Sequence, residues 1–490
     1  MSWDGETRAV APKKAAPNPK KDLLALMQNA DLWHSPEKAA YATIEIAGRV
    51  ENIEVQSAGF KHWLRSLYFK THNFSAPRSA VDDVQDQIEA MALFDHREHP
   101  VFRRVGFSGG ALYIDLCNDA GQVVEVTSNN WTVTDRPAVR FIRSRHARAL
   151  PVPEIDDSPN ALGRLRQYIN VATEDDFRLA VAWLIGAYAP EGPYPIAVIT
   201  GEQGSAKSTV SRILRDLTDP SASLLRSQPR DERDMAIGAV NNRVLAFDNV
   251  SSVPQWQSDA FCRLATGGGF ATRELHSDAE EIVLEAVRPI ILNGITDLVR
   301  RPDLGERSIM ITTRRLAESE RLSERAFRAE YEKDRPYIFG ALLDGLVSAM
   351  RKRDSVHLER LPRMADFAIW ATAAEAGLGF EDRAIVRAFT ANRDAAVRGE
   401  IENDDVATAV IRMIERRDDG IWEGSASSLL IELNQITGEA VQRLKGWPKT
   451  AAGLGQKMAR LQPSLRAIGI DCEKGRAGKD GGRLWTIRQT

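Results

Sequence analysis

The stretch from residue 201 to residue 209 constrains the fold of this 490-residue chain more than any other stretch. It reads Gly-Glu-Gln-Gly-Ser-Ala-Lys-Ser-Thr and follows an apolar run at 195–200, a pattern typical of a strand that leads through a loop into a helix. The two glycines let the backbone curl so that successive N–H groups point inward, and the positive end of the helix adds to them. The stretch therefore predicts a loop that binds phosphate groups.

Lys207 and Ser208 occupy the positions that carry the chemistry of the pattern G-x-x-x-x-G-K-S/T. We expect Lys207 to reach the β- and γ-phosphates of a nucleotide and the Ser208 hydroxyl to hold Mg²⁺. Ala206 stands where the pattern has its second glycine, so the backbone there needs only an angle that a Cβ tolerates. A Gly/Ser-rich turn without a ligand is the alternative. ATP and Mg²⁺ are the expected cofactors. The expected nucleotide-binding residues are Gly201, Glu202, Gln203, Gly204, Ser205, Ala206, Lys207, Ser208 and Thr209.

Composition narrows the class of protein. With 43 % hydrophobic and 27 % charged residues, the chain is typical of a soluble protein with roughly three or four domains. Its cysteines, Cys117, Cys262 and Cys472, lie far apart, which predicts a reduced cytoplasmic compartment and no disulfide framework. The longest apolar stretch, 179–188, is shorter than the roughly 20 residues of a membrane span. Since the net charge is −3, any nucleic-acid binding must depend on local patches.

Changes of pattern along the chain divide it into five segments. Residues 1–21, rich in proline and lysine, are expected to form a disordered tail, and residues 22–155 mix strand and helix patterns as in a small α+β domain. Residues 156–317 carry the phosphate-loop core of an α/β protein. Residues 318–420 are predicted to form a helical lid or linker module, and residues 421–490 a winged-helix-like DNA-binding domain.

Two further apolar strands end in polar side chains. The first ends in Asp248-Asn249 and the second in Asn293. Because the carboxyl ends of parallel strands meet at one edge of a sheet, we expect Asp248 to hold Mg²⁺ together with Ser208. Asn293 is expected to orient water near the γ-phosphate. Asn249 stands where an ATPase usually has a carboxylate that polarises this water, so hydrolysis is expected to be slow or to use another base.

Arg307 lies at the junction between the loop 301–306 and an apolar strand at 308–312. This position suits an arginine that reaches the nucleotide of a neighbouring subunit. A surface ion pair is the alternative. Together with Lys207, Asp248, Asn249 and Asn293, Arg307 completes the expected catalytic set.

The order of these motifs resembles the superfamily 3-like helicase ATPases of phage and plasmid replication proteins. The resemblance covers about 195–315 and includes Ser258-Asp-Ala-Phe-Cys-Arg-Leu-Ala-Thr-Gly-Gly-Gly and Arg301-Pro-Asp-Leu-Gly-Glu-Arg. The resemblance implies an AAA+-type fold with a parallel sheet between helices, a ring oligomer of six subunits, and ATP-driven movement along single-stranded DNA. In that family a hairpin projects into the ring channel. The resemblance therefore implies DNA contacts at Arg273 and His276, although the acidic turn that follows them repels phosphates.

The C-terminal part is predicted to be helical and then to carry a basic DNA-binding fold. Separate helices are expected at 319–332 and 338–352, and a helix at 451–467 is expected to break near Pro463. The helix would enter a major groove, and a loop at 474–483 would form the wing. A basic surface without a duplex partner is the alternative. The expected contacts are Lys457, Arg460, Lys474, Arg476, Lys479 and Arg483.

Taken together, these patterns predict an ATP-dependent DNA helicase or translocase in the cytoplasm of a bacterial host, encoded by a prophage or plasmid. Its expected partners are single-stranded DNA in the ring channel, duplex DNA at the C-terminal domain and further copies of the chain. A separate primase is left open as a partner, and no membrane is expected. Two alternatives stay open: a DNA-binding assembly or loading factor that ATP stabilises, and a defence NTPase of a mobile element.

Overall fold

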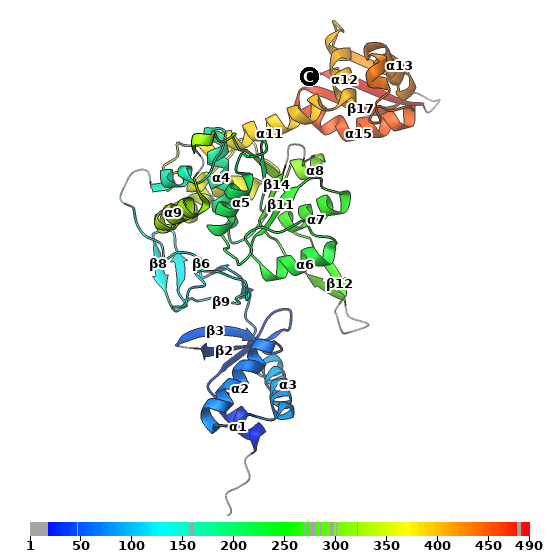
Figure 1. Ribbon diagram of the computed structural model, residues 1–490. Helices are drawn as coiled ribbons and strands as arrows, with labels where there is room; N and C mark the ends of the chain where they lie inside the picture. The colour runs from blue at the N-terminus through cyan, green and yellow to red at the C-terminus, as the bar shows by residue number, and fades with distance from the viewer. Residues whose placement is uncertain are drawn as a thin grey trace, which may run out of the picture. The chain divides into compact units, whose positions relative to one another are not determined.

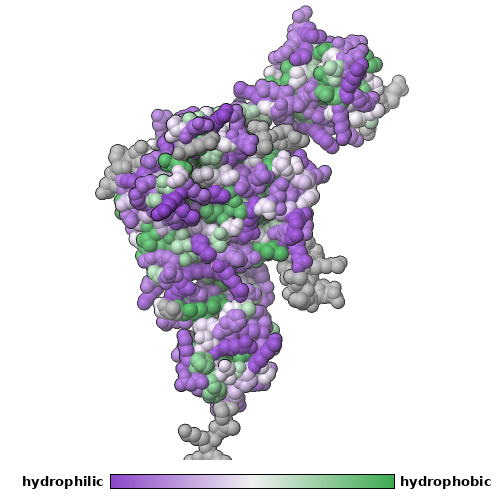
Figure 2. Space-filling view, viewed as in Figure 1, coloured by the Kyte–Doolittle hydropathy of each residue, from purple (hydrophilic) through white to green (hydrophobic). Residues whose placement is uncertain are grey.

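The computed structural model describes residues 18–46, 48–156, 161–268, 270–273, 281–284, 286–294, 298–299, 301–320, 322–477 and 482–490 (Figure 1). The chain divides into two compact units. The first runs up to Glu125 and again from Thr132 to Arg145, and the second comprises Val126–Trp131 and His146–Thr490. Among the described residues, no helix is both long and apolar enough to cross a membrane. Hydrophilic side chains dominate the face seen in Figure 2, and apolar ones are scattered among them.

The first unit packs two helices on an antiparallel sheet, places a third helix against those two, and continues into short strands. Its first part contains α1 (Pro19–Leu26), β1 (Asp31–His34), β2 (Ala40–Ile46), β3 (Arg49–Glu54), α2 (Ala58–His72) and α3 (Arg78–Phe94). The short strands are β4 (Val101–Phe102), β5 (Val105–Ser108), β6 (Ala111–Asp115), β7 (Val123–Val126), β8 (Trp131–Thr134) and β9 (Arg140–Phe141), of which the last residue of β7 and the first of β8 count with the second unit. Helix α1 begins inside the segment 1–21 that was expected to be a tail, because Asn18 caps it and Pro19 suits its first turn.

Asp115 is a buried carboxylate of this first unit. Both of its oxygens accept hydrogen bonds from Arg143, at 2.8 and 2.7 Å, and Oδ1 also accepts from the Cys117 N–H. Although burial opposes the effect, these bonds lower the pKa of the Asp115 carboxyl. Arg143 therefore compensates a buried charge, and this pair holds strand β6 to the segment that follows β9.

The second unit is built around a parallel four-stranded sheet in the order β11-β14-β10-β15. This arrangement confirms the predicted mixed α/β class. Helix α5 lies against β10, β11 and β14, so the strand-loop-helix stretch lies at the middle of the sheet. The elements are the 3₁₀ helix η1 (Ala161–Gln167), α4 (Glu174–Ala187), β10 (Ile196–Thr200), α5 (Lys207–Asp216), α6 (Glu232–Asn241), β11 (Leu245–Val250), α7 (Gln255–Thr266), β12 (Phe270–Arg273), β13 (Glu281–Leu284), β14 (Ile290–Gly294), α8 (Pro302–Gly305) and β15 (Ser308–Thr312).

A helical region follows the sheet. It contains the 3₁₀ helix η2 (Glu318–Glu320), α9 (Glu324–Lys352), the 3₁₀ helix η3 (Arg353–Ser355), α10 (Ala365–Ala374) and α11 (Ala384–Glu402). The expectation of separate helices at 319–332 and 338–352 was wrong, because α9 continues through Pro336. Buried side chains lie on both sides of that proline, among them Tyr331 and Phe339, and their packing outweighs the backbone hydrogen bond that proline removes.

The C-terminal module combines helices with a three-stranded antiparallel sheet. It consists of α12 (Asp405–Glu415), β16 (Ile421–Ser425), α13 (Ala426–Ile436), α14 (Glu439–Gln442), α15 (Ala451–Ala467), β17 (Ile470–Ala477) and β18 (Gly482–Gln489). The antiparallel strands lie in the order β16-β18-β17 and share one core with the helices. The break expected near Pro463 was wrong: α15 is continuous, and buried Leu461 and Leu465 hold the turn on either side of the proline.

Candidate nucleotide-binding site

Glycine at position 201 shapes the loop between β10 and α5. Its φ is 151°, and a Cβ built there would lie 2.2 Å from Thr313 Oγ1 and 2.8 Å from Ser205 Oγ. Thr313 Oγ1 in turn donates to the Thr200 carbonyl at 2.9 Å and lies 2.7 Å from Ser205 Oγ. Only glycine fits this position, and buried hydroxyl groups anchor the loop to the segment that follows β15.

Ala206 adopts a left-handed backbone conformation, with φ 62° and ψ 26°, immediately before α5. This differs from the expectation that the residue needs only an angle that a Cβ tolerates. A left-handed conformation costs a non-glycine residue about 1–2 kcal/mol because its Cβ approaches the following carbonyl oxygen. Ala206 therefore accepts the geometry that the phosphate-loop pattern normally assigns to glycine, at some cost in stability.

Lys207 and Ser208 both have partners within the chain. The Lys207 ammonium donates to the carbonyl oxygens of Gly201, at 2.8 Å, and Glu202, at 2.6 Å, so the side chain folds back over the loop. The Ser208 hydroxyl donates to Asp248 Oδ1 at 2.8 Å. A hydroxyl and a carboxylate are hard oxygen ligands of the kind that Mg²⁺ prefers, so the residues present here fit that ion.

Asn293 joins two elements of the site. Its Oδ1 accepts from the Asn249 N–H at 2.9 Å, and its Nδ2 donates to Ser211 Oγ at 2.8 Å. The side chain of Asn249 is exposed, and its φ of 53° is left-handed. In this arrangement the Asn293 amide, expected to orient water, is committed to protein partners at both ends.

Arg307 lies at the amino end of β15, whereas the phosphate loop follows the carboxyl end of β10. Because these strands are parallel, Arg307 and its own phosphate loop lie at opposite ends of the strands, Arg307 at the amino ends and the loop at the carboxyl ends. The Arg307 guanidinium is half-buried and donates from Nη1 to the Asp303 carbonyl at 2.8 Å. It therefore does not belong to the site that its own subunit forms.

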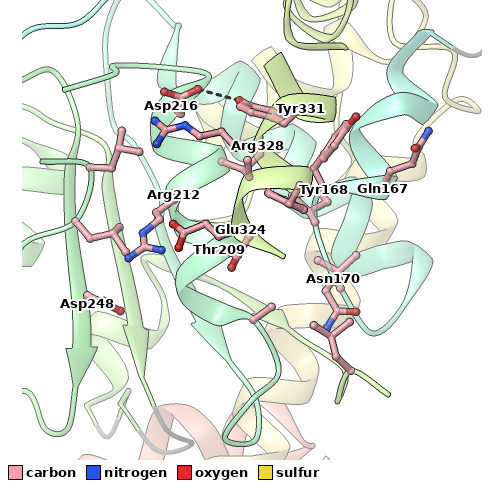
Figure 3. A pocket seen from close by; sticks show the side chains of 18 of the residues that line it. Gln167, Tyr168, Asn170, Thr209, Arg212, Asp216, Asp248, Glu324, Arg328 and Tyr331 are labelled. Atoms are coloured by element: carbon pink, nitrogen blue, oxygen red, sulfur yellow. Dashed lines mark hydrogen bonds between the residues drawn. The ribbon is translucent and has the colours of Figure 1, made fainter. Parts of the chain in front are cut away.

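A cavity of about 1750 Å³ opens beside the phosphate loop and α5 (Figure 3). Asp248, Asn249 and the loop line one part of it. The residues that line the other part were not among the predicted site residues, because they come from separate segments of the chain that no motif spacing connects. Those lining residues include Arg166, Tyr168, Asn170, Arg212, Arg314, Phe327, Arg328 and Tyr331.

Aromatic rings form one wall of this cavity. The Tyr168 ring packs edge-on against Phe327 and Tyr331, with centroids 5.6 and 5.2 Å apart. The Tyr331 hydroxyl donates to Asp216 Oδ2 at 3.0 Å, and Arg335 pairs with the same oxygen at 2.8 Å. Burial raises the pKa of both the Asp216 carboxyl and the Tyr331 hydroxyl. These contacts tie the end of α5 to helix α9.

Two family models match this chain. Residues 162–395 match the actinomycete integrative conjugative element replication protein, and residues 406–490 match the RepA C-terminal domain of the same elements. The chain is similar to these replication proteins. The first match includes the phosphate loop, Asp248, Asn293 and Arg307, and the second covers the C-terminal module. No match was found among curated proteins.

Two solved structures show a distant similarity to the chain. The A form apo structure of the NrS-1 C-terminal region has 12 % identity and a TM-score of 0.40, with 96 % of this chain and 99 % of that chain covered. A JCV helicase has 12 % identity and a TM-score of 0.24, with 43 % of this chain and 67 % of that chain covered. These values are too low to define a shared fold.

The residues that were expected to contact DNA lie in two regions of the chain. Arg273 ends β12, which pairs with β13 in the expected hairpin, and His276 lies outside the described residues. Lys457 forms an ion pair with Asp404, whereas Arg460 on the same helix is exposed.

The remaining expected contacts belong to the β17–β18 hairpin. The Lys474 ammonium lies 5.7 Å from the centre of the Trp485 ring. Arg476 and Arg483 are directly paired in the register of the two strands, and Lys479 lies outside the described residues.

Proposed function

We propose that this protein is a replication ATPase of a mobile element, which binds ATP and Mg²⁺ at the loop between β10 and α5 and couples hydrolysis to movement along DNA. The observation that carries this proposal is the 2.8 Å hydrogen bond from Ser208 to Asp248 beside a phosphate-loop pattern. A hydroxyl and a carboxylate at the carboxyl edge of a parallel sheet are the pair that would hold the metal of a bound nucleotide. The family matches support a role in DNA replication.

Each residue of the site has a role in this proposal. Lys207 exchanges the carbonyls of Gly201 and Glu202 for phosphate oxygens when a nucleotide binds. Ser208 and Asp248 would hold Mg²⁺, which when bound neutralises charge on the β- and γ-phosphates. The backbone N–H groups of the loop and the amino end of α5 orient the phosphates.

Arg307 acts on a second copy of the chain in this proposal, since it lies at the sheet edge opposite its own phosphate loop. The arginine of one subunit then completes the nucleotide-binding site of the next, and such a head-to-tail contact closes into a ring. A hexamer with single-stranded DNA in its channel is the assembly that we propose.

A loading or assembly factor without processive unwinding is the second candidate. Asn249 replaces the usual carboxylate, and Asn293 is bonded at both ends within the chain. Neither side chain acts as a general base for water in this arrangement, which favours ATP as a stabiliser of the assembly. The match to replication proteins favours both candidates over a defence NTPase.

The deciding experiment measures ATP turnover with and without single-stranded DNA, and strand displacement from a forked duplex. A helicase shows DNA-stimulated turnover together with displacement. A loading factor forms an ATP-dependent oligomer on DNA with little turnover and no displacement. Absence of ATP binding in the presence of Mg²⁺ would overturn both candidates.

A further inference from the structure

The end of strand β11 contains an extra residue next to the expected metal position. Phe247 pairs with Leu292 and Val250 pairs with Gly294, so Asp248 and Asn249 together face the single residue Asn293. This is the geometry of a β-bulge, which bends a strand and changes the direction of its side chains. Here the redirected side chain is the Asp248 carboxylate, which receives the hydrogen bond from Ser208.

The backbone N–H groups on the two sides of the bulge point to different partners. The Asp248 N–H donates to the Arg226 carbonyl at 2.8 Å, on the side of β11 away from β14. The Asn249 N–H donates to Asn293 Oδ1 at 2.9 Å, so a side chain replaces the missing backbone acceptor of β14. The left-handed φ of 53° at Asn249 belongs to this local geometry, and asparagine is among the residues that tolerate it.

Asn293 connects the bulge to the phosphate loop as well. Its Nδ2 donates to Ser211 Oγ, and Ser211 Oγ donates to the Lys207 carbonyl at 2.9 Å. Asn293 is 1 % exposed and Ser211 is 0 % exposed. Because buried polar groups are costly to leave without partners, this chain of bonds fixes the first turn of α5 relative to the end of β11.

Gly294 allows the bulge to close. A Cβ at this position would lie 2.0 Å from the Val250 carbonyl oxygen, so no other residue permits that carbonyl to approach β14 so closely. Asn293 therefore stabilises the bulge through a hydrogen bond, and Gly294 stabilises it because it has no side chain.

We propose that Asn293 and Gly294 are positioning residues that lock the bulge at Asp248 and Asn249, and so hold the Asp248 carboxylate beside Ser208 for metal binding. This inference rests on the proposed function, because it concerns the same nucleotide site. It replaces the expected water-orienting role of Asn293 with a role in metal-dependent binding of the nucleotide.

The test measures the dissociation constant of a non-hydrolysable ATP analogue in Mg²⁺ and again in EDTA. The variants are Asn293→Leu, which removes both hydrogen bonds at similar volume, and Gly294→Ala, which changes no polar group. The Mg²⁺ advantage is the dissociation constant in EDTA divided by the dissociation constant in Mg²⁺. We expect this ratio to fall about 10- to 100-fold in both variants, the typical loss when a group supporting a metal ligand is removed. Binding in EDTA should stay within about twofold of wild type, since the loop itself is intact.

Asn392→Leu is the matched control. The Asn392 amide accepts from the Met310 N–H and donates to the Met310 carbonyl. Met310 belongs to β15, the edge strand opposite β11 in the same sheet. The same substitution there removes a similar pair of bonds, and the effect of Mg²⁺ on binding should not change. Thermal unfolding of each variant distinguishes unfolding of the protein from displacement of the Asp248 carboxylate in a folded protein. If Asn293→Leu does not fold, Ser211→Ala replaces it in the test.

The outcomes are distinct. An unchanged Mg²⁺ advantage in folded Asn293→Leu and Gly294→Ala, with turnover lost, would restore the water-orienting role and overturn the inference. Wild-type protein that binds the analogue in neither condition would overturn the proposed function itself. A loss of the Mg²⁺ advantage in Asn392→Leu as well would show that any weakening of the sheet has this effect, and the specific role would be rejected.

Discussion

The nucleotide-binding site and the C-terminal module differ in how their polar side chains find partners. In the site, residues 201–209 lie on one loop and helix, and their contacts are set by short spacing and by the next strands of a parallel sheet. In the C-terminal module, basic residues are spread over α15, β17 and β18, and acidic residues of the same module pair with several of them. Asp404 pairs with Lys457, and Asp471 pairs with Arg466 and Arg488.

This difference shows what a sequence pattern reports. A motif of fixed spacing reports local backbone geometry, which the fold largely preserves. A count of positive charges reports composition only, because tertiary ion pairs decide which cations remain available to phosphates.

Lys207→Ala should abolish ATP binding and turnover while the protein remains folded. Within the described ranges the ammonium donates to two loop carbonyls and the side chain belongs to no hydrophobic core cluster, so its loss removes the phosphate contact without unfolding the chain. Equilibrium binding of ATP and a thermal unfolding curve measure the two effects. Lys352→Ala, an exposed lysine at the end of α9, is the control and should change neither. ATP turnover at the wild-type rate in Lys207→Ala would remove the phosphate-loop assignment.

Arg307→Ala should bind ATP and assemble normally but lose turnover by roughly 10³-fold, the usual loss for an arginine that acts on a neighbouring nucleotide. The side chain lies at the sheet edge away from its own loop, so it cannot complete its own site. Mixing the variant with wild type should lower activity more than in proportion to its share. Activity that falls strictly in proportion would indicate that each subunit works alone.

The predictability of the structure follows the same division. Strand β15 matches its predicted range of 308–312, and β10 differs from its predicted range of 195–200 by one residue, because strong apolar patterns fix both strands locally. Helices α9 and α15 continue through Pro336 and Pro463 because packing with distant segments outweighs the local penalty. The partners of Asn293 could not be predicted either, since they depend on a bulge in another strand.

Two basic residues of α15, Arg460 and Lys457, test whether an ion pair within the module prevents a cation from contacting DNA. Arg460 is exposed and has no ion-pair partner within the described part of the chain, whereas Lys457 is paired with Asp404. Arg460→Ala should lower the slope of log affinity for duplex DNA against log salt by about 0.9, the value for one phosphate contact. Lys457→Ala should leave the slope unchanged. Equal effects of both substitutions would mean that ion pairing within the module does not decide DNA contact, and no effect of either would remove DNA binding from α15.

Ala206→Gly should give the smallest effect, a stabilisation of about 0.5 kcal/mol. Relief of the left-handed conformation contributes about 1–2 kcal/mol, and the greater freedom of glycine in the unfolded chain offsets about 0.5–1 kcal/mol of it. Gly204, with φ 80° in the same loop, provides the opposite change, and Gly204→Ala should destabilise the protein by a similar net amount or more. Chemical denaturation of the three proteins measures the difference. A stabilising Ala206→Gly together with a destabilising Gly204→Ala would confirm that the loop requires left-handed backbone at both positions, even where the sequence supplies glycine at only one. If Ala206→Gly destabilised the protein instead, the strain that we assign to Ala206 would be absent, and the departure from the motif would have no cost in stability.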